Sequence, residues 1–410
     1  MNRAELINHL LSVRRGTRYL EVGVHAEEDN FAHVRAAHKV GVDVDPVTTF
    51  CGTSDEFFAQ NRDVFHLVFI DGLHTEQQVA RDIENAYRCL APGGCVVLHD
   101  CLPPDAWHQR DAEQYNQGEN WNGTVWKAAL REFNRTTHRC CIVDADWGCG
   151  VIDTSAGQIP ARRELPESLD YSTHYPLLLD YIVSASALVR DSVRVFYHLA
   201  CTGDWRQVFE EQLLSLREAG FRSIRLTALG SDEQVREAQA RGAELGVAAE
   251  AVFQAPELTR FEAPAMQAVE AYAREHEGHV LYLHSKGVSS PGDEMKARWR
   301  RLMMRELVEG WEERMPELAH HDAIGVNWRD MPPISHFSGN FWYASTSYLR
   351  RLADFATYYA NPRYQVWDAI SDARLGCEFW IGSGDLPPHV LSLVCRNEDF
   401  CTPAFWATDH

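Results

Sequence analysis

The hydrophobic residues of the first 154 positions form short apolar runs that are separated by amphipathic stretches. The apolar runs predict strands at residues 18–24, 39–46, 65–71, 95–100, 139–145 and 147–154. Between them, apolar residues at helical spacing predict helices at 1–16, 30–37, 54–61, 75–90 and 121–134. Strands that alternate with helices indicate a parallel, doubly wound α/β sheet.

This alternation stops after residue 154 and begins again near residue 193. Residues 155–176 are polar and marked by prolines, and a short helix is predicted near 176–190. Beyond them the same patterns predict strands at 193–200, 223–230, 279–287, 323–328 and 337–345, and helices at 204–220, 232–246, 264–276 and 294–318. We therefore expect two α/β domains, at 1–160 and 193–410, joined by a linker at 161–192.

Composition supports two folded domains and excludes some partners. A chain of 410 residues is longer than one ordinary core. Its net charge of -20 argues against nucleic acid as the main partner, because phosphate binding needs clustered Lys and Arg. The 11 cysteines contain no C-x-x-C pair, which favours reduced thiols and a cytoplasmic location. No transmembrane segment or signal peptide is expected, since no apolar run approaches roughly 20 residues.

Two acids and a histidine lie where predicted strands end. Asp71 and Asp100 close the strands at 65–71 and 95–100, and His74 follows Asp71 by three residues. Because the carboxyl ends of parallel strands meet at one edge of a sheet, these side chains are expected to lie together. Such a group can hold a divalent cation and accept a proton, which suits transfer of a group to a hydroxyl. A helix-capping Asp71 and a surface His74 remain alternatives.

A second group of candidates follows the first two strands. Gly23 comes directly after the first strand, where a glycine lets a ligand approach the backbone closely. Glu21 and Asp43 lie 22 residues apart, and an acid at this distance can bind ribose hydroxyls. The G-x-G-x-x-G pattern is absent, so a pyrophosphate would be poorly bound. S-adenosylmethionine, which carries a ribose and no phosphate, fits better.

Seven motifs in this half carry a family resemblance: YLEVGV, GVDVDP, GTSDEFF, FIDGLHTEQQVARDI, LAPGGCVVLHD, NGTVWKA and WGCGVI. Over residues 1 to about 160 the chain resembles class I S-adenosylmethionine-dependent methyltransferases, and among them the sugar O-methyltransferases of macrolide and polysaccharide pathways. The resemblance implies a Rossmann-like fold. It also implies that Glu21, Gly23 and Asp43 contact the methyl donor, with Ser54 and Asp55 near its adenosine.

The same resemblance implies a Mg²⁺ site and a general base. The metal-dependent members hold Mg²⁺ with an acid after the fourth strand, here Asp71, and with an acid pair after the fifth. This chain has His99-Asp100 in place of that pair, so His99 is either a metal ligand or a structural hydrogen-bonding residue. His74 falls where those relatives carry the base. Proteins of this type often assemble, which leaves a homo-oligomer as an open expectation.

The second half contains a different candidate site. The strand predicted at 279–287 leads into H-S-K-G, where many nucleotide-sugar transferases carry D-x-D. His284 and Lys286 are two potential cations, and Lys286 could neutralise a diphosphate as a point charge. This arrangement predicts a metal-independent donor site. The alternative is that Lys286 is a solvated loop charge.

Residues 193–410 resemble glycosyltransferases with a GT-A-like α/β fold through the HSKG loop, the GVNWR strand, and HFSGNFWYAS followed by EFWIG. The resemblance implies that Gly339 and Asn340 lie against donor and acceptor, and that Glu378 is the catalytic base of an inverting transfer. Competitors for the role of base are Asp368, Asp372 and Asp385, because spacing does not choose among them.

These features together predict a bifunctional enzyme of glycan biosynthesis. The first domain would methylate a hydroxyl of a glycan or sugar acceptor, and the second would transfer a sugar from a nucleotide-sugar donor. Two alternatives stay open: a second half that only binds glycan, and a non-sugar acceptor such as a catechol or a macrolide. The polar insert at 105–123 favours a polar acceptor and has the length of a lid. The tryptophans that are either core residues or sugar platforms are Trp121, Trp126 and Trp147.

Overall fold

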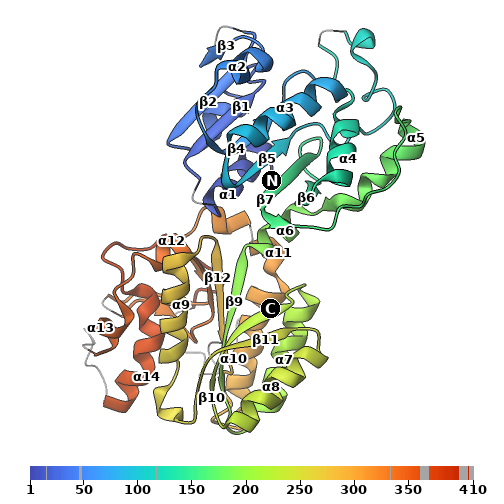
Figure 1. Cartoon of the computed structure of the whole chain (residues 1–410). Coiled ribbons are helices and arrows are strands. Elements are labelled where there is room, and N and C mark those ends of the chain that lie inside the picture. The colour runs from blue at the N-terminus through green and yellow to red at the C-terminus, as the bar shows by residue number, and fades with distance from the viewer. Residues whose placement is uncertain are drawn as a thin grey trace. The chain divides into compact units, whose positions relative to one another are not determined.

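The structure is a computed structural model (Figure 1). It describes residues 1–14, 16–45, 49–116, 118–314, 316–332, 334–360, 369–396 and 405. The chain divides into two compact units, Met1–Val189 and Arg190–His410, and each unit contains one large sheet. The two units are described separately below.

The first unit is built on an eight-stranded sheet in the order β3-β2-β1-β4-β5-β7-β6-β8. The strands are β1 (Arg18–Val22), β2 (His38–Asp43), β3 (Phe50–Cys51), β4 (Phe65–Ile70), β5 (Leu90–Leu98), β6 (His138–Val143), β7 (Cys149–Gly157) and β8 (Ile182–Val183). All pairings are parallel except those of β7 with β5 and β6. The predicted Rossmann-like α/β fold is confirmed, with a switch of strand order between β1 and β4.

Helices cover both faces of this sheet. They are α1 (Arg3–Ser12), α2 (Ser54–Gln60), α3 (Glu76–Cys89) and α4 (Val125–Arg135). Side chains alternate along each strand, so Leu67 and Phe69 of β4 pack in the cluster that contains the apolar residues of α1. Val68 and Ile70 instead pack in the cluster that contains those of α3 and α4. The strands are therefore buried on both faces, as parallel sheets require.

The start of α3 sets the position of the site. Thr75 caps the helix by accepting a hydrogen bond from the backbone N–H of Gln78 at 3.4 Å. Val79, Ile83 and Ala86 follow at helical spacing and are buried against the sheet. Because α3 is capped and buried against the sheet from its start, only a short connection separates it from β4. His74 lies in this connection and therefore at the carboxyl edge of the sheet.

Two predicted elements in this half differ from the structure. The helix expected at 30–37 is only a short 3₁₀ turn at Phe31–His33, so that prediction was wrong. β2 begins at His38, which leaves too few residues for an α-helix after the turn. The strand predicted at 147–154 is β7, which begins at Cys149. Asp146, Trp147 and Gly148 all have positive φ and form a tight turn before it.

The segment predicted as a linker contributes to the first unit. Ile182 and Val183 form β8, which pairs in parallel with β6. Upstream, the rings of Tyr171 and Tyr175 pack edge-on against Trp126, with centroids 5.8 and 5.6 Å from its ring. Short helical turns lie around them at α5 (Tyr171–His174), Tyr175–Leu177 and Leu179–Tyr181, before α6 (Ala185–Asp191).

The second unit contains a seven-stranded sheet in the order β11-β10-β9-β12-β16-β13-β17. Its strands are β9 (Val193–Ala200), β10 (Ser223–Leu229), β11 (Ala248–Ala255), β12 (His279–His284), β13 (Ala323–Gly325), β16 (Trp342–Ser345) and β17 (Val390–Ser392). β16 is antiparallel to both of its neighbours, and the other pairings are parallel. The prediction of a second α/β domain is confirmed. Sequence patterns missed β11, since most of its side chains are exposed at the sheet edge.

The remaining elements of this unit surround that sheet. A separate two-stranded ribbon pairs β14 (Trp328–Arg329) with β15 (His336–Phe337). The helices are α7 (Trp205–Glu218), α8 (Asp232–Glu244), α9 (Ala263–Glu275), α10 (Glu294–Met304), α11 (Trp311–Arg314), α12 (Thr346–Leu349), α13 (Phe355–Ala360) and α14 (Ala369–Phe379). Among the described residues, no helix is long and apolar enough to cross a membrane. The ten cysteines in the described ranges are free thiols.

Candidate active site

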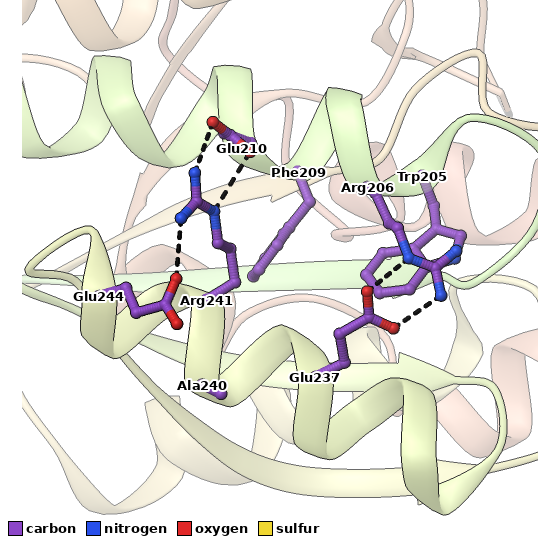
Figure 2. Close-up of a pocket in the computed structure, with 8 residues that line it drawn as sticks. All are labelled: Trp205, Arg206, Phe209, Glu210, Glu237, Ala240, Arg241 and Glu244. Carbon is purple, nitrogen blue, oxygen red and sulfur yellow. Dashed lines mark hydrogen bonds and ion pairs between the residues drawn. The ribbon is translucent and has the colours of Figure 1, made fainter.

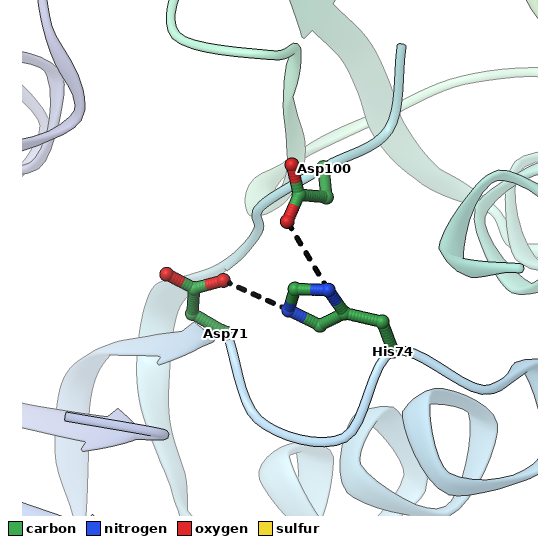
Figure 3. Close-up of side chains that lie close together, drawn as sticks. All are labelled: Asp71, His74 and Asp100. Atoms are coloured by element: carbon green, nitrogen blue, oxygen red, sulfur yellow. Dashed lines mark hydrogen bonds and ion pairs between the residues drawn. The ribbon is translucent and has the colours of Figure 1, made fainter. Parts of the chain in front are cut away.

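Three predicted residues of the first unit lie together at the carboxyl edge of the sheet. Asp71 follows β4, Asp100 follows β5, and His74 lies between β4 and α3. The His74 ring stands between the two acids, with Nε2 3.2 Å from Asp71 Oδ1 and Nδ1 3.3 Å from Asp100 Oδ2 (Figure 3). We call these three residues the acid–histidine cluster. Its candidate ligand atoms lie within 4.8 Å of one another.

The imidazole of His74 is held at both nitrogens. Besides its contact with Asp100, Nδ1 lies 3.0 Å from the carbonyl oxygen of Trp121, to which it can donate a hydrogen bond. Burial lowers the pKa of His74, but the carboxylates of Asp71 and Asp100 outweigh it and leave the pKa above its usual value. The ring therefore has a defined orientation.

A second histidine and an arginine complete the surroundings of Asp71. His99 is 4% exposed, with Nδ1 3.1 Å from Asp71 Oδ1 and 3.3 Å from Asp100 Oδ2. Nη1 of Arg3, from α1, donates to Asp71 Oδ2 at 3.3 Å. Burial raises the pKa of Asp71, but His99 and His74 together hold it well below its usual range. Asp71 is consequently an anion at every physiological pH.

The backbone of this edge is specialised to present the cluster. Asp100 has a φ of 60°, a conformation that few residues other than glycine adopt. Its Oδ1 accepts a hydrogen bond of 2.7 Å from Asn122, which is almost fully buried. A Cβ on Gly123 would lie 2.1 Å from the carbonyl oxygen of His74, so only glycine fits there. The insert at 105–123 is therefore held to Asp100 by the hydrogen bond of Asn122, and to His74 by the close packing of Gly123.

The donor chemistry of the acid–histidine cluster fits a divalent cation. Two carboxylates and one imidazole offer ligand atoms close enough to share an ion. His99 stands beside these three residues, where its ring nitrogens contact carboxylates of Asp71, Asp100 and Asp146. The near-complete burial of His99 and its contacts with three carboxylates fit a residue that orients the acids.

The predicted methyl-donor residues surround the end of β1. Gly23 has a φ of 87°, and a Cβ there would lie 2.1 Å from the carbonyl oxygen of Asp71. Asp43 accepts hydrogen bonds from the backbone N–H groups of His25 at 2.9 Å and Asp45 at 3.0 Å. Glu21 is 1% exposed and accepts from the Tyr19 hydroxyl at 2.5 Å, so its carboxyl is part of a buried network.

Ser54 and Asp55 begin α2 and face α3. Gln78 donates to Ser54 Oγ at 3.1 Å and to Asp55 Oδ1 at 3.4 Å. Gln78 also donates to Asp82, which is 1% exposed and whose pKa is raised to about 6, mainly by burial. These contacts fix the first turn of α2 against α3 beside the ends of β2 and β3.

We expect Glu21→Gln to stabilise the chain increasingly as pH rises. Burial raises the pKa of Glu21 to about 7, although hydrogen bonds from Tyr19 and Asn30 oppose the shift. Because the folded pKa lies above the unfolded one, the stability from the protonated carboxyl is complete below about pH 4.5 and is lost as pH rises through 7. The free energy of unfolding of the variant relative to wild type should therefore rise by about 2–3 kcal/mol between pH 4.5 and 8.

Denaturant unfolding at several pH values measures this difference. The exposed Glu27 serves as the control, and Glu27→Gln should change the free energy of unfolding by less than about 0.5 kcal/mol throughout. A pH-independent difference for Glu21→Gln would contradict the expectation.

The second unit also brings its predicted residues together. His284 ends β12, next to β9 at the switch of strand order, and its Nε2 lies 3.0 Å from the carbonyl oxygen of Gly339. Glu378 accepts a hydrogen bond of 2.5 Å from the backbone N–H of Gly339. Asn340, at a φ of 58° and 1% exposed, donates to Glu262 Oε2 at 2.7 Å. Asp368 lies outside the described residues.

His284 differs from its predicted role as a cation. Burial and the nearby Lys286 lower the pKa of His284 to about 3, so its imidazole is neutral at physiological pH. Lys286 is half-buried in the loop after β12, and its carbonyl oxygen accepts a hydrogen bond from Arg300 at 2.8 Å. In this pair of predicted cations, the positive charge belongs to Lys286.

A separate pocket of about 260 Å³ lies between α7 and α8 (Figure 2). Its charged side chains are paired with one another: Arg206 with Glu237, and Arg241 with Glu210 and Glu244. The pocket lies along two helices, whereas the predicted donor residues lie at the carboxyl end of β12 and just before β16. It is distinct from the candidate donor site.

Sequence reasoning missed four residues that contact the two sites. Arg3 and Asn122 contact acids of the acid–histidine cluster, and Asp146 Oδ1 lies 3.7 Å from His99 Nε2. Glu262 binds Tyr282, Asn340 and His284 in the second unit. Arg3, Asp146 and Glu262 lie outside the motifs that carry the family resemblance, whereas Asn122 is the first residue of NGTVWKA. The signals that could have found them are the place of Asn122 in that motif and the position of Asp146 between two predicted strands.

Comparison with known families separates the two units. Residues 5–101 match the profile of a methyltransferase domain. Residues 196–374 match a domain of unknown function, DUF8361. A search of curated proteins found no match.

Solved structures match parts of this chain at low identity and with low TM-scores. The O-methyltransferase TomG from Streptomyces achromogenes, solved with S-adenosylmethionine, is 12% identical, and the match covers 37% of this chain and 79% of that chain with a TM-score of 0.28. MycE from the mycinamycin biosynthetic pathway, solved with Mg, S-adenosylhomocysteine and mycinamycin VI, is 16% identical over 37% of this chain and 49% of its own, with a TM-score of 0.25. HddC from Yersinia pseudotuberculosis is 8% identical over 52% and 96%, with a TM-score of 0.28. The family profile and the strand order show that the first unit contains a methyltransferase domain with a Rossmann-like fold, which an α/β domain of unknown function follows.

Proposed function

We propose that the first unit transfers a methyl group from S-adenosylmethionine to a hydroxyl of a sugar. The observation that carries this proposal is the acid–histidine cluster at the carboxyl edge of a methyltransferase-type sheet. Gly23 packs at the end of β1 against the backbone of Asp71, and Asp43 ends β2 as an acid for the ribose of the donor. The donor and the reacting hydroxyl would meet at this edge.

Each residue of the cluster has a role in this reaction. Asp71 and Asp100, with His99 as a further candidate ligand, would hold Mg²⁺, and the bound ion would lower the pKa of the acceptor hydroxyl. His74 is the proposed base, oriented by the Trp121 carbonyl, and it accepts the hydroxyl proton once the negative charge of the acids is balanced. Asp100 and Asn122 keep the edge of the site in place. The methyl group then moves to the hydroxyl oxygen while the sulfur of the donor becomes neutral.

For the second unit we propose transfer of a sugar from a nucleotide donor on a GT-A-like fold. This proposal is supported by the meeting of His284, Gly339 and Glu378 at the switch of strand order between β9 and β12. Lys286 would neutralise the diphosphate, and Glu378 would accept the proton of the acceptor hydroxyl. Together the two units would form a bifunctional enzyme of glycan assembly with domains near 1–160 and 193–410.

Thermal unfolding of the full chain with a panel of ligands tests both proposals. The panel contains S-adenosylhomocysteine with and without Mg²⁺, and UDP, GDP, CDP and dTDP. A ligand at 100 times its dissociation constant adds about 2.7 kcal/mol to the free energy of unfolding, which is measurable. Stabilisation by S-adenosylhomocysteine and by one nucleotide supports two donor sites. If no nucleotide stabilises the chain, the second unit is a glycan-binding or inactive domain.

Lys286→Met should weaken binding of the stabilising nucleotide diphosphate about tenfold or more, because a charge-assisted contact to phosphate is lost. Isothermal titration of the purified variant measures the dissociation constant. The control is Arg236→Met, which removes one exposed positive charge from α8 and should leave the constant unchanged. Equal losses in both variants would indicate a general charge effect and reject the role of Lys286.

A further inference from the structure

Two sets of aromatic side chains border the acid–histidine cluster. In the first, Tyr115 stacks on Trp121 with ring centroids 4.7 Å apart. The Trp121 ring lies 5.5 Å from that of His74, and its carbonyl oxygen contacts His74 Nδ1. The Trp121 indole N–H donates to the Arg110 carbonyl at 2.8 Å. Trp121 thus supports His74, while Tyr115 is 38% exposed.

Trp147 belongs to the turn between β6 and β7. It follows Asp146, whose Oδ1 lies 3.7 Å from His99 Nε2. The indole is 42% exposed and its ring lies 5.7 Å from that of His108 in the insert. Trp126, in contrast, is completely buried in the core. Trp147 therefore differs from an ordinary core tryptophan.

The backbone around Trp147 is strained. Asp146 and Trp147 have φ values of 49° and 63°, and a bulky residue with positive φ is an outlier. Such conformations are costly and cluster at functional sites. The backbone N–H of Leu102 donates to the Trp147 carbonyl at 2.8 Å, so the turn is held in this form. This conformation exposes the apolar ring of Trp147 beside charged groups. A ligand that binds the ring would explain the exposure.

The insert that carries Tyr115 is braced from within. Arg110 is 4% exposed and donates to the carbonyl oxygens of Trp107, Gln114 and Asn120. Its guanidinium also pairs with Glu119 at 2.6 Å. A binding surface that is ordered before the ligand arrives loses less entropy on binding. Each exposed ring lies on a segment that reaches the cluster or its neighbour, Tyr115 through Trp121 and His74, and Trp147 through Asp146 and His99.

We propose that Tyr115 and Trp147 form the acceptor subsite and stack against the apolar faces of a pyranose ring. The inference rests on the proposed methyl transfer and specifies its substrate class. A sugar presents C–H groups to aromatic faces and hydroxyls at its edge. The aromatic rings meet the first requirement, and the acids and histidines of the neighbouring cluster meet the second.

Saturation-transfer NMR on the chain loaded with S-adenosylhomocysteine tests this subsite. The probes are the methyl glycosides of glucose, galactose, mannose, rhamnose and N-acetylglucosamine, with catechol as the non-sugar probe. We expect saturable binding of at least one glycoside, with transfer strongest to the protons on the apolar face of its ring. Trp147→Ala and Tyr115→Ala should each weaken binding about tenfold, and Trp147→Phe by threefold or less.

The control is Ile159→Ala. Ile159 is 96% exposed and follows the far end of β7, so it lies at the opposite edge of the sheet from Trp147. Its replacement should leave glycoside affinity unchanged. Circular dichroism verifies that each variant is folded, and Trp147→Phe preserves the test if Trp147→Ala is unstable.

The result that overturns the inference is distinct from failure of the proposed function. If S-adenosylhomocysteine binds but no glycoside does, or if catechol alone binds, the sugar subsite and the sugar acceptor are rejected, while the methyl-donor site of the proposed function stands. Unchanged affinity in both alanine variants also rejects it. If S-adenosylhomocysteine itself does not bind, the proposed methyl transfer fails first.

Discussion

Asp71→Asn should lower the rate of methyl transfer by at least about 100-fold. Asp71 is the acid that contacts His74, His99 and Arg3, so its charge organises the entire edge. Without it, the site loses a carboxylate ligand for Mg²⁺ and the partner that orients His74. The rate is measured with S-adenosylmethionine and the glycoside that binds best. In addition, Mg²⁺ should no longer raise the unfolding temperature of the chain loaded with S-adenosylhomocysteine.

The matched control for this prediction is Asp63→Asn. Asp63 precedes the same strand at its opposite end and pairs with Arg18 on the surface at 2.6 Å, with 53% of its side chain exposed. An exposed pair of this kind contributes about 0–1 kcal/mol, and the rate should not change. A folded Asp71→Asn variant that retains a rate within threefold of wild type would falsify the assignment of Asp71.

Gly23→Ala should destabilise the first unit by more than about 3 kcal/mol. The added Cβ would lie 2.1 Å from the carbonyl oxygen and 2.4 Å from the carbonyl carbon of Asp71. Both are backbone atoms of the strand end that carries the acid, so relief requires β1 and β4 to separate. The φ of 87° adds a further cost for any residue with a side chain. Denaturant unfolding measures the loss in free energy.

Gly93→Ala separates the two contributions. Gly93 also has positive φ, at 74°, but the nearest atom to an added Cβ is 3.7 Å away. This variant should lose only the conformational part, about 1–2 kcal/mol. If both variants lose the same free energy, the close approach of β1 to Asp71 is not the reason that glycine occupies position 23.

Most of the fold of the first unit could be predicted because its signals are local. β4 and the second half of β5 are short, mainly apolar runs, and α3 shows helical spacing with a capping threonine. The helix predicted at 30–37 failed for the opposite reason. Its apolar residues had helical spacing, but the early start of β2 at His38 left no room for a helix. Local patterns could not reveal that restriction.

The amino-acid sequence alone determined the class of the fold and the identity of the central acids. Asp71 and Asp100 end apolar runs, and parallel strands of one sheet place such ends at the same edge. The spacing of His74 from Asp71 then brings its ring into the same site. These relations follow from the direction of the chain and the period of its side chains, both of which are local properties.

Only the tertiary structure decided what surrounds those acids. Arg3 contacts Asp71 although 68 positions of sequence separate the two residues. Asp146 contacts His99 from the turn between β6 and β7. The roles of the tryptophans were likewise settled by packing, since Trp126 is buried and Trp147 is exposed. Such contacts depend on how distant elements pack and on which φ values a turn adopts, and no short stretch of sequence contains that information.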